Sequence, residues 1–300
     1  MLLEEKVIRY IKRNIPSKTD IKKEFGLKDK DFQKVITKIG KEYNLVHTNK
    51  HYAIEKEYKK FEDTRILKDG NMHPTILFMS DTHISDKKCN YELIKKNIEF
   101  AYNEGARIIF HSGDITAGNG KVYRGQIHDL EHLTFEQQVE TAINTFPYKK
   151  DLHYYMINGN HDESHMVSNS GNVGKSISDK REDIHFLGDG YGRMVYNDIK
   201  IDLVHLAGGS CYSISYPIQV YLRNFLQGKY EDKPNIVSAG HFHKLLYFDC
   251  YGIRALMPGH YQGENSFTKR KGLNGKQGSV LTEFNIINKL PKNFKAQYIN

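Results

Sequence analysis

The sequence contains few cysteines and no long hydrophobic run. Its three cysteines, Cys89, Cys211 and Cys250, are widely spaced and form no C-x-x-C pair, which excludes a disulfide framework and a cysteine-ligated zinc ribbon. No segment approaches the roughly 18 apolar residues of a membrane span, and the charged N-terminus lacks the apolar core of a signal peptide. We therefore expect a cytoplasmic protein with reduced cysteines and no membrane contact.

The positive charge is concentrated at one end of the chain. Residues 1–60 contain 16 Lys and Arg against nine Asp and Glu, a net charge of +7, whereas the remaining residues contain 28 against 27 and are close to neutral. Such asymmetry is typical of a segment that meets a polyanion. With 300 residues in all, the chain is long enough for one large domain and a small one.

The basic segment shows helical periodicity followed by a hairpin pattern. Three apolar stretches at helical spacing precede a predicted β-hairpin: residues 3–11, 17–26 and 32–39, with the hairpin at 45–54. In the third stretch the apolar side chains occupy one face and lysines the other. This order resembles a winged-helix domain over residues 1–56.

In the winged-helix family the third helix enters the major groove of DNA. The resemblance implies nucleic-acid contact through the polar face of that helix, namely Gln33, Lys34, Thr37, Lys38 and Lys41. Two alternatives remain open: the lysines keep a small domain soluble, or the domain docks another protein.

Residues 57–73 are charged and aperiodic, which predicts a linker. From residue 74 the pattern changes to alternating strands and helices, typical of an α/β domain over residues 74–300. The predicted strands are Thr75–Met79, Arg107–Phe110, His153–Ile157, Lys200–Leu206 and Ile236–Ala239, and the clearest helices are Tyr91–Tyr102 and Phe135–Phe146.

Polar side chains follow all five predicted strands. They are Asp81, His83, Asp114, Asn160, His161, His205, His241 and His243. Because the carboxyl ends of strands in such sheets meet at one edge, we expect these side chains to converge. Imidazole, carboxylate and amide ligands without thiolate favour manganese, iron or zinc.

Taken in order, these segments resemble a known family. The series SDTH (80–83), SGD (112–114), NGNHD (158–162), VH (204–205) and GHFH (240–243) is similar to the five motifs of calcineurin-like metallophosphoesterases. The resemblance implies a β-sandwich flanked by helices and two divalent ions, with manganese foremost and iron, zinc or magnesium as alternatives. Asp81, His83 and His243 would hold one ion, Asn160, His205 and His241 the other, and Asp114 would bridge them.

Two ions about 4 Å apart can share a hydroxide and stabilise both oxygens of an in-line displacement at phosphorus. We expect His161 to act as the general acid. Related protein phosphatases extend the second motif with an Asp that orients this acid, whereas this chain has Ala117 there. The partner that orients His161 is therefore not predicted, and a protein-phosphatase reading is disfavoured.

The sequence thus predicts a phosphodiesterase or nuclease acting on DNA or RNA. Basic residues that can contact the phosphate backbone near the site are Arg124, Lys269, Arg270 and Lys271. Two alternatives remain: a phosphatase or small-molecule phosphodiesterase with a docking domain, or a DNA-binding protein with a vestigial catalytic site.

Overall fold

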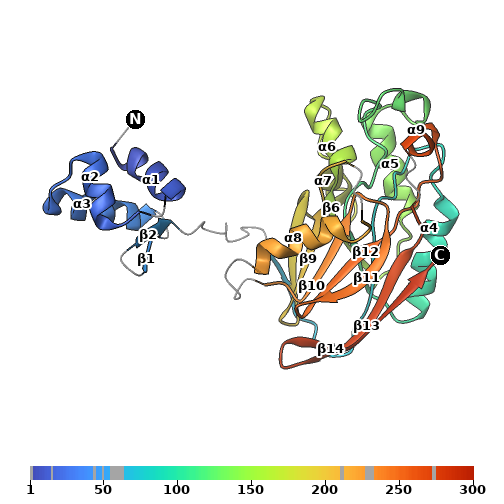
Figure 1. Ribbon diagram of the computed structural model, residues 1–300. Coiled ribbons are helices and arrows are strands. Elements are labelled where there is room, and N and C mark those ends of the chain that lie inside the picture. Colours follow the sequence, from blue (N-terminus) through green and yellow to red (C-terminus); the bar gives the residue numbers. More distant parts are fainter. Residues whose placement is uncertain are drawn as a thin grey trace. The chain divides into compact units, whose positions relative to one another are not determined.

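The chain folds into two compact units. A computed structural model describes residues 3–14, 16–42, 45–48, 51–54, 64–209, 213–226, 233–271 and 275–300 (Figure 1). The first unit comprises Met1–Glu62 and the second Asp63–Asn300. Within the described residues no helix is long and apolar enough to cross a membrane. Cys89 and Cys250 are free thiols, and Cys211 lies outside the described residues.

In the first unit the described residues form three helices and a hairpin: α1 (Leu3–Asn14), α2 (Lys18–Phe25), α3 (Asp29–Glu42), β1 (Leu45–Thr48) and β2 (His51–Ile54). Ser17 begins α2 with a capping box to Asp20, and Gly26 ends it at a φ of 63°, a backbone conformation that favours glycine. Val7, Ile11, Ile21, Phe32 and Ile39 form the core between the helices. The strands pair antiparallel.

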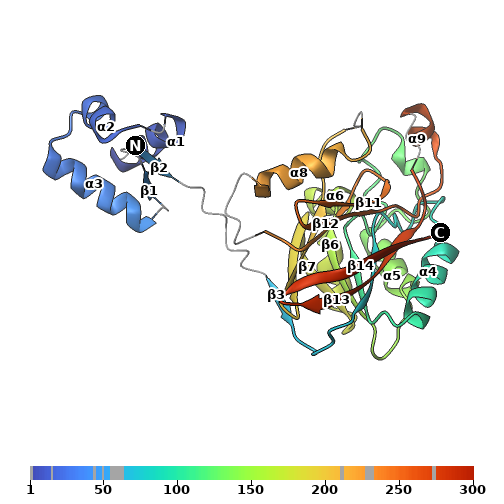
Figure 2. The same ribbon diagram turned by 60° about the horizontal axis from the view of Figure 1, so that its bottom comes forward.

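The described part of the second unit contains two six-stranded mixed sheets. In spatial order, the first consists of β14 (Leu290–Ile299), β13 (Ser279–Ile287), β4 (Thr75–Met79), β5 (Ile108–His111), β6 (His153–Asn158) and β7 (Ile184–Asp189). The second consists of β11 (Leu245–Cys250), β12 (Ile253–Pro258), β10 (Ile236–Gly240), β9 (Ile199–His205), β8 (Tyr191–Tyr196) and β3 (Arg65–Leu67). Figure 2 shows β13 and β14 running together near the C-terminus.

The two sheets pack face to face and are flanked by helices, as the sequence predicts. Residues from both sheets share one buried cluster, with Phe78 and Phe110 from the first and Met194 and Ile201 from the second. Helices α4 (Tyr91–Asn103), α5 (Phe135–Thr145) and α7 (Val173–Ser178) cover the outer face of the first sheet, and α8 (Tyr216–Leu226) covers the second (Figure 1). A strand enclosed on both faces needs a continuous apolar run, which explains the pattern of β4.

The structure corrects the prediction of a linker over residues 57–73. Residues 57–63 lie outside the described residues. Arg65–Leu67 form β3, which pairs in parallel with Met194–Tyr196 of β8. Asp69 then accepts hydrogen bonds from the Tyr196 hydroxyl and from the Asn197 amide. The second half of the predicted linker is therefore part of the sandwich.

Candidate metal centre

The predicted ligands lie where strands of both sheets end. Asp81 and His83 follow β4, Asp114 follows β5, and Asn160 begins α6 (Asn160–Val167) directly after β6, all from the first sheet. His205 is the last residue of β9, and His241 and His243 follow β10, from the second sheet. Because β4, β5 and β6 are mutually parallel, as are β9 and β10, the sandwich brings these ends together at one edge. The site therefore spans both sheets.

The backbone at these positions is strained. Asp81, His83, Asp114, His241 and His243 all have positive φ angles, between 45° and 91°, a region that residues with a Cβ rarely adopt. Such conformations persist only where surrounding contacts hold them, and they cluster at functional sites. The packing is also tight, since a Cβ at Gly159 would collide with a carboxylate oxygen of Asp114. The loops are thus built to point side chains inward at close range.

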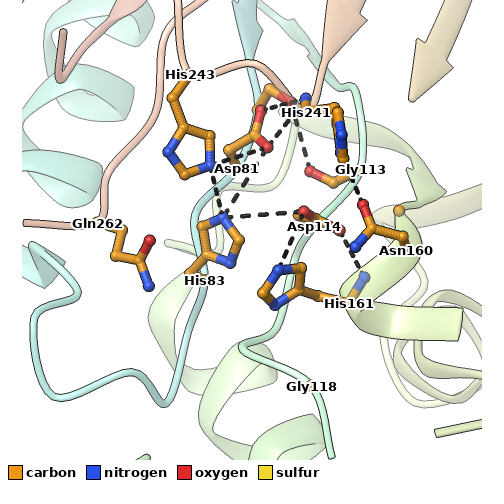
Figure 3. Close-up of polar contacts among 12 residues, drawn as sticks. Asp81, His83, Gly113, Asp114, Gly118, Asn160, His161, His241, His243 and Gln262 are labelled. Atoms are coloured by element: carbon orange, nitrogen blue, oxygen red, sulfur yellow. Dashed lines mark hydrogen bonds and ion pairs between the residues drawn. The ribbon is translucent and has the colours of Figure 1, made fainter. Parts of the chain in front are cut away.

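Asp81, His83 and His243 form the first ligand group. Asp81 Oδ1 lies 3.4 Å from His243 Nε2 and 4.0 Å from His83 Nε2, and the two imidazole nitrogens are 3.0 Å apart. The backbone N–H of His241 donates to Asp81 Oδ1 at 3.0 Å, which fixes the carboxylate (Figure 3). Three ligand atoms therefore converge from two loops 160 residues apart.

Asp114, Asn160, His205 and His241 form the second group. Asn160 Oδ1 lies 3.1 Å from His205 Nε2 and 2.8 Å from His241 Nδ1, and Asp114 Oδ2 lies 3.2 Å from His205 Nε2. The same oxygen is 3.9 Å from His83 Nε2 in the first group. Asp114 thus stands between the two groups, and its Oδ1 accepts the backbone N–H of His161.

The donor atoms of this site fit divalent ions. His205 Nδ1 donates to the Ser112 carbonyl at 2.9 Å, and His241 Nε2 donates to the Gly208 carbonyl at 2.8 Å. Such second bonds orient metal-binding histidines and leave the other ring nitrogen free. At Asn160 Oδ1, lone pairs of an amide oxygen and of neutral imidazoles would face each other, which is unfavourable unless a cation or proton lies between them. All seven side chains can therefore act as ligands of divalent ions.

In the metal-free protein, burial and the charges of neighbouring side chains shift the pKa values of the candidate ligands. Burial raises the pKa of Asp81 and Asp114, but the neighbouring His243 and His205 outweigh it, and both values fall below the usual range. Burial lowers the pKa of His205, yet the Asp114 charge raises it to about 10. Burial, with His161 nearby, lowers the pKa of His83 well below its ordinary value. Both carboxylates are thus ionised and can neutralise cations.

The structure identifies the group that orients His161. Its Nδ1 lies 2.6 Å from the backbone carbonyl of Ala117, which can only accept, so Nδ1 carries a proton. Buried Gln126 donates to the same carbonyl, also at 2.6 Å, and its own Oε1 accepts from the Val122 N–H. In this chain a backbone carbonyl therefore orients His161, at the residue where related phosphatases have an Asp. Among the described residues no hydrogen bond engages His161 Nε2, which lies 3.9 Å from Asp114 Oδ2.

Asp162 is a site residue that sequence reasoning missed. Its buried carboxylate accepts from the backbone N–H groups of Ile115, Thr116 and Gly159 and from the Thr116 hydroxyl, at 2.8–2.9 Å. Burial and the Asp114 charge raise its pKa to about 6, against the three backbone N–H donors, which lower it. Asp162 ties the loop that carries Asp114 to the turn that carries Asn160. Its position directly after Asn-His in the NGNHD motif was the available signal.

A cavity of about 310 Å³ opens onto both ligand groups. Its walls comprise His83, Asp114, Asn160, His161, His241 and His243, together with Val122, Tyr123, Phe242, Lys244, Gln262, Asn265 and Thr268. The Tyr123 hydroxyl donates to Asp129 at 2.8 Å and accepts from the Asn265 amide at 3.2 Å. These bonds connect the loop after β5 to the segment before α9 (Ser266–Lys271) and define one wall.

The predicted nucleic-acid contacts lie in both units. In the first unit, Gln33, Lys34, Thr37 and Lys38 are exposed on α3 and line one hollow, whereas the Lys41 side chain lies outside the described residues. In the second unit, Arg124 is exposed one residue from Tyr123, and Lys269 and Arg270 are exposed on α9. The Lys271 side chain is not among the described ones.

Comparison with known protein families gives one that matches the second unit. The model of the calcineurin-like phosphoesterase superfamily domain matches residues 75–273, which includes every predicted metal ligand. No curated protein matches the chain.

Several solved structures are similar to this chain. A novel archaeal phosphodiesterase is 15% identical, with a TM-score of 0.44 over 75% of this chain and 99% of that chain. The phosphoesterase Yfce from E. coli is 16% identical, with a TM-score of 0.40 over 75% and 100%. A predicted phosphoesterase from Streptococcus pneumoniae is 14% identical, with a TM-score of 0.38 over 76% and 98%.

The family match covers two thirds of the sequence and coincides with the α/β sandwich and its cluster of ligands. The chain therefore belongs to the calcineurin-like phosphoesterase superfamily and is a metal-dependent phosphoesterase.

Proposed function

We propose that the chain is a phosphodiesterase that cleaves nucleic acid with two divalent ions. Asp81, His83 and His243 would hold one ion, and Asn160, His205 and His241 would hold the other. The observation that carries this proposal is the position of Asp114 Oδ2, which lies 3.9 Å from His83 Nε2 and 3.2 Å from His205 Nε2. A carboxylate placed between two ligand groups is suited to bridge two ions.

The ions supply an activated water and neutralise the charge on the phosphate when they are bound. Manganese is the foremost candidate, because the ligands are imidazole, carboxylate and amide groups, with no thiolate. The protein's own part is to fix those ligands, and the strained loops and the carbonyl bonds of His205 and His241 do so before any ion arrives. Such preorganisation leaves little rearrangement for the reaction itself.

His161 supplies the proton for the leaving oxygen. Its Nδ1 proton is engaged by the Ala117 carbonyl, so the proton that is transferred must sit on Nε2, the nitrogen that faces the cavity. The Gln126 amide donates to the same Ala117 carbonyl and holds it in place. A general acid positioned in this way contributes typically about 10²–10⁴-fold to the rate.

The first unit supports a nucleic-acid substrate. Its three helices and hairpin follow the order of a winged-helix domain, and Ser17 forms an additional bridge to His51 of the hairpin. Lys30, Lys34 and Lys38 line one hollow of α3 with Gln33 and Thr37, although Lys38 also pairs with Glu4 at 2.8 Å. This exposed basic face, on a segment of net charge +7, can bind a phosphate backbone.

A second candidate is a phosphodiesterase acting on a small molecule, with the first unit as a docking module. The size of the catalytic cavity favours it, since about 310 Å³ lies at the lower end of the roughly 300–1,000 Å³ of ligand pockets. A cavity of this size suits one nucleotide or a chain end better than the middle of a duplex.

The test compares substrates on one protein preparation. Protein loaded with manganese is incubated with bis(p-nitrophenyl) phosphate and with end-labelled single-stranded and duplex DNA. We expect hydrolysis of the chromogenic diester and shortening of the single strand, and loss of both in Asp114→Asn. Hydrolysis of the small diester with intact DNA would favour the second candidate, and full activity of Asp114→Asn would contradict the bridging role.

A further inference from the structure

The short segment of residues 117–119 passes beside the proposed general acid. Its first carbonyl, that of Ala117, lies 2.6 Å from His161 Nδ1, and we call these three residues the carbonyl segment. A carbonyl on a loop can orient an imidazole only if the loop itself is held, because supporting contacts set the precision of a site. The hydrogen bonds that hold the carbonyl segment therefore bear on the orientation of His161.

Gln126 holds the carbonyl oxygen. It begins the short 3₁₀ helix η1 (Gln126–His128) and is only 1% exposed. Its Oε1 accepts the Val122 N–H at 2.9 Å, which fixes the orientation of the amide, and its Nε2 donates to the Ala117 oxygen at 2.6 Å. Because a carbonyl oxygen has two lone pairs, Gln126 and His161 can together saturate it.

Gln138 of α5 holds the residue that follows. Its buried amide accepts the Gly118 N–H at 3.2 Å and donates to the Gly118 carbonyl at 2.9 Å. The amide also donates to the His132 carbonyl at 2.9 Å and meets His165 Nε2 at 3.2 Å. All the hydrogen-bonding capacity of this side chain is therefore used, and half of it is directed at Gly118.

One peptide group connects the two glutamines. The Ala117 carbonyl and the Gly118 N–H belong to the same planar unit, which Gln126 holds at its oxygen and Gln138 at its nitrogen. This unit cannot rotate without breaking both bonds. If it turned over, the Gly118 N–H would face His161 Nδ1, and a donor there would oppose the Nδ1 proton. The two bonds therefore keep an acceptor in front of His161.

The carbonyl segment is also fastened to the helix that carries His161. The Asn119 side chain donates to the Ser164 carbonyl at 2.7 Å, and the Asn119 N–H donates to Ser164 Oγ at 3.0 Å. Gly118 has a φ of 92°, and a Cβ at this position would lie 2.9 Å from the His161 carbonyl. These contacts keep the segment close to α6, and the glutamines restrict the rotation of its peptide group.

Buried amides can also serve only to satisfy buried backbone groups. Two observations favour a role in orientation. Gln126 and Gln138 come from different elements, yet they meet on the one peptide group that contacts the His161 ring. Apart from the Ala117 carbonyl, the group that hydrogen-bonds nearest to His161 Nδ1 among the described residues is Gln126 Nε2 at 3.3 Å. Since that nitrogen is a donor, the carbonyl alone can hold the Nδ1 proton.

We propose that Gln126 and Gln138 are positioning residues of His161. They fix the peptide group between Ala117 and Gly118, and its carbonyl directs Nε2 of the acid to the leaving oxygen. This inference rests on the proposed phosphodiesterase function with His161 as its acid. It adds two residues that lie in none of the five motifs and that take over the orienting role of the Asp in related protein phosphatases.

The experiment uses two diesters that differ only in the leaving group, the p-nitrophenyl and the phenyl ester of thymidine 5′-phosphate. p-Nitrophenolate departs without a proton, whereas phenolate is a poorer leaving group that needs one. The variant Gln126→Met keeps the length of the side chain and removes the amide. We expect kcat on the phenyl ester to fall roughly 10-fold, a part of the about 10²–10⁴-fold contribution of a general acid, while kcat on the p-nitrophenyl ester changes little.

Two further variants test the other end of the peptide group and the effect of stability. Gln138→Met should lower the same ratio of kcat values. Thr282→Val is the matched control, because it also removes a buried hydrogen bond, from Thr282 Oγ1 to the Ile76 carbonyl at 3.1 Å, but from β13. It should leave the ratio as in the wild type. Urea unfolding checks that each protein is folded, and mass spectrometry should find equal manganese contents.

The double variant of Gln126→Met with His161→Gln separates orientation from support of the fold. If Gln126 acts through His161, its substitution should cause no further loss on the phenyl ester once the acid is removed, because the effects of coupled residues do not add. If Gln126 only supports the fold, the two losses should multiply.

The outcomes distinguish the positioning role from the proposed function. Multiplied losses, equal losses on both esters, or an unchanged ratio in both glutamine variants would overturn the positioning role while the phosphodiesterase stands. A wild type that hydrolyses only the p-nitrophenyl ester has no effective general acid, which also overturns it. A wild type that hydrolyses neither ester overturns the proposed function and the positioning role with it.

Discussion

Asp162→Asn tests how the site is held together. The substitution keeps the shape of the side chain but replaces one carboxylate oxygen by an NH₂ group. Asp162 Oδ2 accepts from Ile115 and Gly159, whereas Oδ1 accepts from the N–H and the hydroxyl of Thr116. In either orientation the new NH₂ faces at least one buried backbone N–H, which then has no acceptor.

The magnitude follows from these four bonds. A buried donor without an acceptor costs about 1–3 kcal/mol, and the remaining bonds lose the extra strength of a charged acceptor. We therefore expect Asp162→Asn to lower the free energy of unfolding by roughly 2–5 kcal/mol, a large part of the typical 5–15 kcal/mol of a native protein. The loops that carry Asp114 and Asn160 should also separate and weaken metal binding.

Urea unfolding of chelator-treated protein at pH 8 measures this effect without the contribution of bound ions. At that pH the Asp162 carboxyl is ionised, because its pKa is raised only to about 6 by burial and the Asp114 charge. Asp179→Asn removes the same charge from an exposed position at the end of α7 and should change stability by less than about 0.5 kcal/mol. If Asp162→Asn stays within about 1 kcal/mol of the wild type, the four bonds do not have the role assigned to them.

Three further predictions concern His161 as the general acid, the protonation of His205 and the basic face of α3. His161→Gln should reduce kcat roughly 100-fold or more on a diester with a sugar alkoxide leaving group but much less on p-nitrophenyl esters, which need no proton; equal losses on both would exclude a general acid. In the metal-free protein burial lowers the pKa of His205, but the Asp114 charge raises it to about 10, above its ordinary 6.5. The protonated ring therefore stabilises the fold fully below pH 6.5, and this stability is lost as the pH rises through 10. Urea unfolding from pH 6.5 to 10 should show that loss, and His205→Gln should flatten it. Exchanging Lys30 and Lys34 for Glu should reduce the slope of log K for DNA binding against log salt concentration by about 1.5–2, measured by fluorescence anisotropy. An unaltered slope would show that these lysines do not contact DNA.

Five strands of the sandwich, β4, β5, β6, β9 and β10, were predictable because they are enclosed on both faces. The strand Thr75–Met79 has the same bounds in the sequence prediction and in the structure. Of the other four predicted strands, two differ by one residue at one end and two are shifted by one residue at both ends. Such runs of apolar residues are strong local signals. In contrast, Arg65–Leu67 is too short for any periodicity, and it becomes a strand only through pairing with β8.

The candidate metal ligands could be named from the same sequence for a different reason. Each stands next to a strand end, and their types and order resemble one family's motifs. What the sequence could not show are contacts between distant segments, such as the Ala117 carbonyl on His161 or the stack of His260 on His243. A backbone carbonyl has no sequence identity, and a lone histidine in a loop has no periodic neighbours, so neither contact leaves a pattern.

The most direct test of the account is the anomalous electron density of crystals soaked in manganese. Two peaks about 3.5–4 Å apart are expected, one beside Asp81, His83 and His243, the other beside Asn160, His205 and His241, with Asp114 touching both. A single peak, or two peaks that Asp114 does not join, would contradict the two-ion centre.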